Sequence, residues 1–587
     1  TSLPLHLYLS LFISHSSTLP LPLSLDTLIK TFAMRTHFRL KESSVQTNVD
    51  EGILEGFVHS INGKDCEVYL GVPYASPPIG DLRFKKPEPH PGWDGVKKCK
   101  RFASRSIQKD MFWDKVVIPL QQSEDCLYLN VFAPKRGDGK TYPVLFYIHG
   151  GGFMMDSAAK YAYKDVCEQI TSKDCVLVTI QYRLGYLGFF SLGSNSCKGN
   201  YGLWDQLMAL QWTKKNISSF GGDPDKITVA GQSAGAVSTD LLSLSPLSRD
   251  LFHQKITMGG NSFCHWAVSD QQEIDDFCRK KARRLGWKPK KKYFATQEEE
   301  DEAMMNYLRK VPAHKFACHM IGTKEVFNEA RLPLCPVIDG EILPRPLSIL
   351  REESTPKPSI GGVGEYESLL FVALGFIRCN GKFLDMMMSM VSKRAKGKDA
   401  LKDIQESVRD IYGDWRGKSR KELARICVLF LSDLISNYAS HQYMKDAQRH
   451  GLPTYVYSLD FTSRNMWGFL KAVIPFCERR GTHASELLYL FKCNYFVAAL
   501  PMDSNDKIVA DIMPRLITNF VKYGNPNAAD TRELGVQWDP IQKDHKPMLS
   551  ISPQTHMKSV AFEGRMERLN ELFIKYNLDY RYHISQR

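Results

Sequence analysis

Closely spaced cysteine pairs are absent from the sequence, although it contains 14 cysteines. Zinc ribbons hold their metal with CxxC pairs, and none occurs here, so we do not expect one. His314, Cys318 and His319 lie near one another, but no second ligand pair has matching spacing. We therefore interpret these three residues as a buried cysteine beside two surface histidines, and we expect no metal site.

Residues 1–25 contain no charged side chain. A secretory signal peptide has a basic segment before its apolar core and a cleavage site of small residues after it, and neither is evident here. Pro4, Pro20 and Pro22 oppose a membrane-spanning helix. We expect residues 1–45 to be a low-complexity or disordered segment, with Met34 as a candidate start. A degenerate signal anchor is the alternative.

A basic face of the kind that binds nucleic acid is also missing. The net charge is +13, but the densest basic run, residues 279–292, is followed by an acidic run at residues 298–302. Interleaved aromatics and a known nucleic-acid module are lacking too, so we expect no nucleic-acid partner. Internal repeats and linkers are not evident. With 587 residues, 43% of them hydrophobic, the chain is predicted to form one large domain over residues 46–580.

Apolar runs of strand length alternate with stretches of helical period. Residues 143–148 and 175–182 are predicted to be buried strands, and residues 203–220 have a helical spacing of apolar side chains. This alternation is typical of an α/β protein with a mostly parallel sheet and helices on both faces. Residues 280–326 are predicted to be a charged helical insertion, and residues 383–446 are predicted to be mostly helical.

Residues 220–235, FGGDPDKITVAGQSAG, contain the strongest chemical signal in the chain. Residues 231–235 fit the G-x-S-x-G nucleophile elbow, between a short apolar strand and a buried helix over residues 236–244. The turn exposes the hydroxyl of Ser233, and its flanks are glycine because a Cβ there would collide with the neighbouring strand and helix. A bare G-x-S-x-G also fits an ordinary strand-to-helix turn, so the rest of a hydrolase site must decide.

A second motif lies upstream of the elbow. Residues 149–153, HGGGF, follow the predicted strand 143–148 and fit the HGGG oxyanion loop. Glycine lets backbone N–H groups approach a substrate closely, so we predict that those of Gly151, Gly152 and Ala234 stabilise a developing oxyanion. A flexible turn is the alternative, but two motifs in the order expected of a serine hydrolase favour an acyl-transfer site.

An acyl-transfer site of this kind also needs an acid and a histidine, in the chain order Ser, Asp or Glu, His. The 16 histidines leave the choice open from pattern alone. His483 follows a late strand-like segment, residues 455–461, as the topology requires. Periodicity shows no more than that.

Together these motifs resemble those of the type-B carboxylesterase and cholinesterase family of α/β-hydrolases. The similarity covers residues 54–572, nearly the whole chain. It includes the serine signature at residues 220–235, a second signature at residues 124–131, and further matches at residues 69–78, 80–84, 200–206, 339–340 and 520–527. The resemblance implies an α/β-hydrolase fold and hydrolysis of carboxylic esters without a cofactor.

The resemblance also assigns the acid and the histidine of the site. The family's acid falls on Glu367 and its histidine on His483. The family usually has glycine after both, where this chain has Ser368 and Ala484. Both replacements are small, so we expect the triad to be retained. Glu365, two residues before Glu367, is the rival acid.

Choline esters are not expected as substrates. Cholinesterases have a tryptophan where this chain has Val116, and its Trp113 is out of register. The residue before the nucleophile is often acidic in the family, and here it is Gln232. Because a quaternary ammonium binds to an aromatic face and favours nearby negative charge, the resemblance is closer to general carboxylesterases.

The cysteines differ from those of secreted family members. Those members usually pair Cys126 with a cysteine near position 106, and Cys264 with one near position 287. This chain has Ser106 and Trp287 there. Because disulfides persist in oxidising compartments, their loss favours a cytoplasmic location. The secretory pathway or the extracellular space is the alternative.

We therefore predict a serine hydrolase that cleaves small-molecule carboxylic esters through an acyl-enzyme on Ser233. The rival is a catalytically inactive adhesion or scaffold member of the same fold. Such members generally lack the nucleophile and have a membrane span near the C-terminus, whereas this chain has Ser233 and a polar tail, residues 566–587. A lipase-like hydrolase of long-chain esters is a narrower alternative. No clear membrane span is evident in the sequence. None of its motifs indicates the acyl preference or the oligomeric state.

Overall fold

The computed structural model describes residues 43–576, apart from residues 112–113, 115–117, 119, 138, 290–293, 320–331, 375–378, 393–399, 469–479, 494–500, 529–530, 532–534 and 559. Some expectations from the sequence fall outside the described residues. They concern the segment before residue 43, including Met34, the positions of Trp113 and Val116, and residues 577–587 of the tail.

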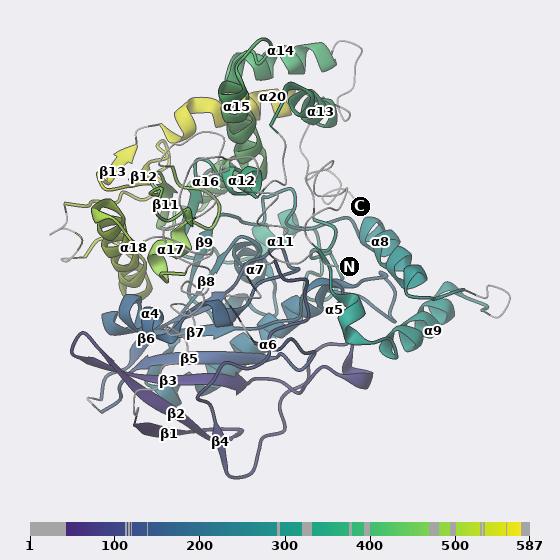
Figure 1. Ribbon diagram of the computed structural model, residues 1–587, viewed down its shortest axis with the longest axis vertical. Coiled ribbons are helices and arrows are strands. Elements are labelled where there is room, and N and C mark those ends of the chain that lie inside the picture. Colours follow the sequence, from purple (N-terminus) through teal and green to yellow (C-terminus); the bar gives the residue numbers. More distant parts are fainter. Residues whose placement is uncertain are drawn as a thin grey trace, which may run out of the picture.

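Thirteen strands in the described part of the chain form one sheet, in the order β1-β2-β3-β5-β7-β6-β8-β9-β10-β11-β12-β13, with β4 beside β2 (Figure 1). Their bounds are β1 Ser44–Val49, β2 Gly52–Ile61, β3 Lys64–Pro73, β4 Val96–Lys98, β5 Tyr128–Pro134, β6 Tyr142–Ile148, β7 Val176–Ile180, β8 Gly222–Gln232, β9 Gln254–Met258, β10 Ser359–Gly364, β11 Thr454–Leu459, β12 Met548–Ile551 and β13 His556–Lys558. The first strand thus begins two residues before the predicted domain boundary at residue 46.

The sheet is antiparallel at its N-terminal edge and parallel through its centre. Antiparallel pairs join β1, β2, β3, β5 and β7, and one more joins β12 to β13. The run from β7 through β6, β8, β9, β10 and β11 to β12 is parallel. Parallel neighbours need crossover connections, for which this chain uses helices. The predicted α/β fold with a mostly parallel sheet is confirmed, and the predicted strands at residues 143–148 and 175–182 are β6 and β7.

Successive side chains of β6 enter two different cores. Val144, Phe146 and Ile148 pack on one face of the sheet, and Leu145 and Tyr147 pack on the other. The alternation follows from the two-residue period of a strand. Both faces are buried, which explains why the predicted strand is a continuous apolar run.

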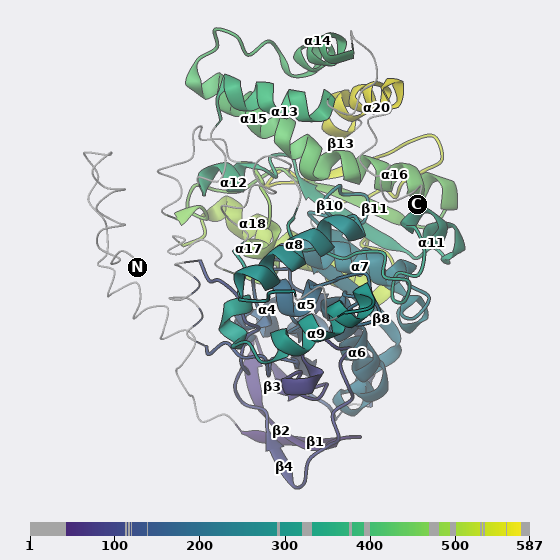
Figure 2. The same cartoon turned by 90° about the vertical axis from the view of Figure 1, so that its right-hand side faces the viewer.

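Helices cover both faces of the sheet (Figures 1 and 2). The helices that share a core with Val144 include α5 Gly185–Phe189, α6 Tyr201–Asn216, α7 Ala234–Leu244, α8 Gln271–Arg284, α9 Gln297–Arg309 and α11 Leu347–Glu353. The helices that share a core with Leu145 are α4 Tyr163–Gln169, α17 Glu486–Leu490 and α18 Ser504–Tyr523. This two-sided cover is the arrangement that the sequence predicts.

A further group of helices forms its own core beside β10 and β11. Its members are α13 Gly381–Ser392, α14 Ala400–Tyr412, α15 Arg420–Ser432, α16 Tyr438–His450 and α20 Arg565–Lys575. Figure 1 shows α13, α14, α15 and α20 together at the top of the molecule. The described parts of residues 383–446 are therefore mostly helical, as predicted, and the C-terminal helix α20 packs on them.

One long helix, Arg420–His450, includes α15, a π-helical turn at Asp433–Asn437, and α16. In the described part of the chain it is the one helix long and apolar enough to cross a membrane by length and composition. However, 67% of its most apolar window is buried inside the fold. Such burial is typical of a core helix, so its apolar surface is already used for packing.

The oppositely charged runs noted in the sequence meet on α8 and α9. Arg279 on α8 donates from Nη1 to Asp301 Oδ1 on α9 at 2.6 Å. The side chain of Thr296 caps α9 by accepting a hydrogen bond from the N–H of Glu299. The basic and acidic runs are therefore joined by an ion pair between two helices at one side of the molecule (right in Figure 1).

Candidate active site

Ser233 lies at the sharp turn between β8 and α7. Its backbone has φ 57° and ψ −123°, a conformation that residues with a side chain rarely adopt. A Cβ on Gly231 would lie 2.2 Å from the backbone of Gly235, and one on Gly235 would lie 2.1 Å from the carbonyl oxygen of Ile148. Glycine is required at both positions because backbone segments cross there at contact distance.

The glycine loop after β6 lies against this turn. A Cβ on Gly150 would lie 3.0 Å from the Cβ of Ser233. Gly151 and Gly152 have φ angles of 91° and 59°, in the left-handed region that favours glycine. Ala234 is the first residue of α7, where N–H groups have no acceptor within the helix. The fold thus brings the loop and the first turn of α7 beside the Ser233 side chain.

His483 connects Ser233 to Glu367. His483 Nε2 lies 2.8 Å from Ser233 Oγ, and Nδ1 lies 2.5 Å from Glu367 Oε2. All three side chains are buried, with exposed fractions of 8% for Ser233, 7% for His483 and 0% for Glu367. They come from segments that follow β8, β10 and β11, whose carboxyl ends meet at one edge because these strands are parallel.

The segments that carry Glu367 and His483 are also bonded to each other. The N–H of His483 donates to the carbonyl of Glu367 at 3.2 Å, and Thr482 Oγ1 donates to the carbonyl of Tyr366 at 2.9 Å. Glu367 Oε1 accepts from the N–H of Gly364 at 2.5 Å. One carboxylate oxygen therefore faces the backbone and the other faces the imidazole, which fixes the orientation of the carboxylate.

Glu365, the rival acid, has other partners. Its carboxylate lies 3.5 Å from Arg480 Nη1 and 3.7 Å from Arg565 Nη1 on α20. The structure thus brings Glu367 to His483 and pairs Glu365 with two arginines.

The two small residues that replace the family's glycines differ in backbone conformation. Ser368 has φ −77° and ψ −9°, an ordinary helical conformation that needs no glycine. Ala484 has φ 66°, in the left-handed region where glycine is favoured. The replacement at position 484 therefore strains the backbone, and the one at position 368 does not.

Burial and a neighbouring carboxylate act in opposite directions on His483. Burial by itself lowers the pKa of the imidazole, but the adjacent Glu367 carboxylate outweighs it and raises the net pKa above its ordinary value. The charged imidazolium is therefore stabilised once it forms. A general base benefits from this stabilisation after it takes a proton.

A second buried carboxyl group, that of Glu486, was missed in the sequence. It is 2% exposed, opens α17, and its Oε1 has no hydrogen-bond partner among the described residues. Gln232 forms a hydrogen bond with it, and Gln232 Nε2 lies 3.4 Å from His483 Nε2. Burial, followed by the charge of Glu367, raises the pKa of Glu486 to about 8. The only available signal was one acidic residue opening an otherwise apolar helix.

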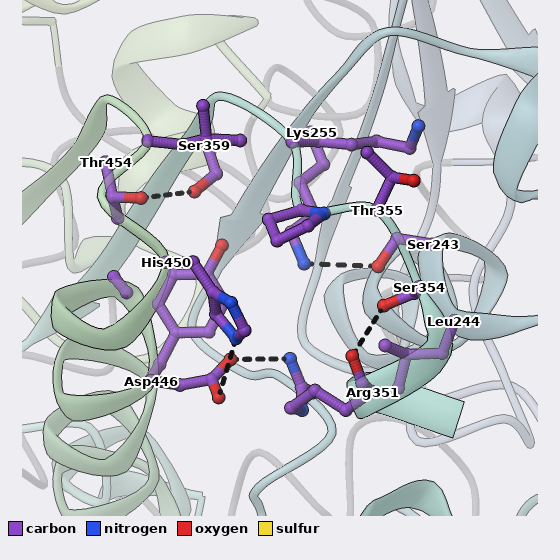
Figure 3. Close-up of a pocket in the computed structure, with 15 residues that line it drawn as sticks. Ser243, Leu244, Lys255, Arg351, Ser354, Thr355, Ser359, Asp446, His450 and Thr454 are labelled. Atoms are coloured by element: carbon purple, nitrogen blue, oxygen red, sulfur yellow. Dashed lines mark hydrogen bonds and ion pairs between the residues drawn. The ribbon is translucent and has the colours of Figure 1, made fainter. Parts of the chain in front are cut away.

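A pocket of about 480 Å³, including its open mouth, lies at the opposite edge of the sheet from this site (Figure 3). Its lining includes Ser359, the first residue of β10, whereas Glu367 follows the end of that strand. Two of its cations are held by carboxylates: Lys255 donates to Asp240 at 2.6 Å, and Arg351 donates to Asp446 at 3.0 Å. A third cation of the lining, Lys357, lies with its ammonium group 5.0 Å from the centroid of the Phe252 ring.

Cys126 and Cys264 are buried and have free thiols. The thiol of Cys126 lies within hydrogen-bond reach of Ser106, near the position where secreted members of the family that this chain resembles usually have a cysteine. Burial raises the pKa of Cys126 to about 12, so its thiol is protonated and unreactive. Among the described residues, no group of three or more His, Cys, Asp or Glu side chains is placed to hold a metal ion.

Comparisons with known proteins extend over most of the chain. The family model described as "Carboxylesterase family" matches residues 41–569. The chain is 33% identical to esterase cest-33 of Caenorhabditis elegans over 89% of its own length and 93% of that protein. It is 30% identical to bile salt-activated lipase of Bos taurus, covering 88% of this chain and 85% of the lipase. It is also 30% identical to neuroligin-3 of Mus musculus, covering 78% of this chain and 58% of neuroligin-3.

Proposed function

Because the chain belongs to the carboxylesterase family and is a serine hydrolase of carboxylic esters, we propose that Ser233, Glu367 and His483 are its catalytic triad. The observation that carries this proposal is the continuous path of hydrogen bonds from Ser233 Oγ through the imidazole to Glu367 Oε2, with distances of 2.8 Å and 2.5 Å. Similarity to named esterases does not choose among residues, so these roles rest on the geometry.

In the acylation step, Ser233 Oγ attacks the ester carbonyl while His483 Nε2 takes the hydroxyl proton. Glu367 keeps the other ring nitrogen, Nδ1, protonated and stabilises the imidazolium. The tetrahedral intermediate collapses when the imidazolium gives its proton to the leaving alcohol, and the acyl group remains on Ser233. Water then attacks the acyl-enzyme by the same route and releases the carboxylic acid.

The negative charge on the carbonyl oxygen needs donors that are already in place. We assign this role to the N–H groups of Gly151, Gly152 and Ala234. The contact between the glycine loop and the Ser233 turn supports the assignment. Loss of one such donor typically costs about 3 kcal/mol of transition-state stabilisation.

The variant Ser233→Ala tests the nucleophile. We expect kcat to fall by about 10⁶-fold and organophosphate labelling of the active-site serine to disappear, with an unchanged circular dichroism spectrum. Ser238→Ala is a matched control, because it removes a buried hydroxyl of α7 that has no hydrogen-bond partner among the described residues. Near wild-type turnover by purified Ser233→Ala would require another nucleophile.

The substrates are carboxylic esters, and their acyl chain length is a separate question. A panel of aryl esters with short and long acyl chains distinguishes a general carboxylesterase from a lipase-like enzyme. We propose the first, since the motifs resemble general carboxylesterases. A preference for the longest acyl chains would favour the lipase-like alternative.

We also propose that the folded chain works in a reducing compartment such as the cytoplasm. The free thiol of Cys126 beside Ser106 supports this proposal, because the pair forms a hydrogen bond where secreted members usually have a disulfide.

A further inference from the structure

The loop that carries Glu367 is held from outside by two polar side chains of the long helix Arg420–His450. Ser432, at the end of α15, accepts through Oγ a hydrogen bond from the N–H of Ser368 at 3.0 Å. Asn437, at the end of the π turn, donates from Nδ2 to the carbonyl of Glu365 at 3.2 Å. These contacts lie one residue after and two residues before Glu367. We call Ser432 and Asn437 the loop clamp.

The π turn explains how two residues five positions apart reach one loop. In an α-helix, residues three and four apart share a face. The i→i+5 hydrogen bonding of a π turn instead brings residues five apart above one another, and such turns are frequent at functional sites. The turn Asp433–Asn437 begins directly after Ser432 and ends with Asn437. Within the turn, the carbonyl of Ile435 accepts a hydrogen bond from Trp266 Nε1 at 2.9 Å.

Asp433 anchors the turn within the molecule. Its carboxylate accepts from Tyr412 on α14 at 2.7 Å and from Arg565 Nε on α20 at 2.8 Å. It also accepts from Asn437 Nδ2 at 2.8 Å, so Asn437 is oriented before it reaches the loop. Asp433 and Asn437 are both fully buried. The clamp is therefore connected to α14 and α20 through a hydrogen-bonded network centred on the buried Asp433 carboxylate.

We propose that Ser432 and Asn437 are positioning residues for the acid of the triad. Their hydrogen bonds hold the loop at the place where the Glu367 carboxylate meets His483 Nδ1. This inference rests on the proposed triad, since the position of the loop matters for the reaction only if Glu367 is the acid. A displacement of about 1 Å in a catalytic group can cost about 10²-fold in rate, so two backbone contacts beside Glu367 are enough to matter.

The test compares Ser432→Ala and Asn437→Ala with Ser436→Ala in kinetic assays across pH. Ser436 lies in the same π turn, and its buried hydroxyl has no hydrogen-bond partner among the described residues, so it is the matched control. We expect the two clamp variants to lower kcat about ten- to hundred-fold, with KM changed less than about twofold. Ser432→Thr keeps the hydroxyl and should restore most of the kcat.

The pH profile separates positioning from general stability. Glu367 raises the pKa of His483, so a displaced carboxylate raises it less, and the acid limb of kcat/KM should move to lower pH in both clamp variants. Glu486, on α17, is the other titratable group that acts on His483, and its pKa of about 8 places its titration on the alkaline side. A merely structural role would lower the melting temperature and leave kcat and the acid limb of the folded enzyme unchanged.

Glu367→Gln is measured in the same assay. If Glu367→Gln loses most of its kcat while Ser432→Ala and Asn437→Ala retain the wild-type kcat and acid limb, the positioning role of the loop clamp is refuted and the proposed triad is retained. If Glu367→Gln retains wild-type activity, the proposed triad is wrong. The inference that Ser432 and Asn437 position the triad acid is then wrong as well.

Discussion

Glu365 and Glu367 are two residues apart, yet their carboxylates have different partners. In a continuous strand, such a pair would share a face, so alternation cannot separate them. β10 ends at Gly364, and the turn that follows sends Glu365 towards Arg480 and Arg565 and Glu367 towards His483. Strand alternation therefore left two candidates. The family resemblance pointed to Glu367, and the path of the loop brings the carboxylate of Glu367, not that of Glu365, to the imidazole.

The first prediction follows from this pair. Glu367→Gln should lower kcat by about 10⁴-fold, because an amide at that position favours the wrong imidazole tautomer. Glu365→Gln should change kcat little, since its carboxylate contacts arginines rather than the imidazole. Steady-state hydrolysis of an aryl ester measures both variants, and the reverse pattern would assign the acid to Glu365.

The second prediction concerns the left-handed backbone of Ala484. Ala484→Gly should raise the free energy of unfolding by about 1 kcal/mol, because the left-handed conformation costs a residue with a Cβ more than it costs glycine. Ser368→Gly is the matched comparison and should lower this free energy by about 1 kcal/mol, since it loses the hydrogen bond from Ser368 Oγ to the carbonyl of Val428. Urea denaturation measures both, and equal effects would contradict the argument.

At the scale of elements, α17 begins inside the core with an acidic residue. Glu486 has a folded-state pKa of about 8, well above its ordinary value near 4.5, so the folded protein keeps a proton that the unfolded chain releases. Stability is therefore lost progressively as pH rises from about 5 to about 8, and the loss is complete above that range.

The third prediction uses this linkage. Glu486→Gln removes the titration and keeps an amide that can still bond to Gln232. Its melting temperature relative to the wild type should therefore increase from pH 5 to pH 8 and stay constant above. Differential scanning calorimetry at several pH values measures the difference, and a difference that is independent of pH would show that Glu486 does not titrate as argued.

The elements differ in how far the sequence could predict them. The strands β6 and β8 and the helix α7 were predictable because each combines an apolar run with an adjoining motif, and β7 was predictable from its apolar run alone. The mostly helical character of the described part of residues 383–446 was predictable too, but its π turn was not, since nothing local in the sequence marks the extra residue. The loop clamp depends on that turn and on partners more than 60 positions away, such as Ser368 for Ser432. Contacts of this kind arise only in the tertiary structure.

At the scale of the whole molecule, whether the cysteines are free or disulfide-bonded depends on the redox state of the compartment in which the chain folds. The fourth prediction is that native protein, alkylated without a reductant, has unpaired Cys126 and Cys264. The expected partners are replaced by Ser106 and Trp287, so neither thiol has a cysteine to join at those positions. Mass spectrometry of the alkylated peptides measures this, and a disulfide at either cysteine would contradict the proposal that the chain works in a reducing compartment.

The variant Ser106→Cys supplies a positive control for the thiol experiment. The Cys126 thiol already lies within hydrogen-bond reach of residue 106, so oxidation should form the missing disulfide. A bridge closing a loop of this size stabilises a fold by about 3 kcal/mol in the chain-entropy model. The oxidised variant should therefore melt at a higher temperature than its reduced form.

The backbone of Ser233 also affects how such a sequence changes over generations. Its φ and ψ of 57° and −123° suit glycine and cost a serine about 1–3 kcal/mol. A Ser233→Gly variant would therefore be inactive, and its free energy of unfolding would be higher than that of its parent. Because drift under selection for folding alone accepts such replacements, the serine persists only while ester hydrolysis itself is selected. Without selection for ester hydrolysis, a lineage becomes more stable when it loses the serine nucleophile. This fold therefore favours the evolution of homologues that retain the fold and lack catalytic activity.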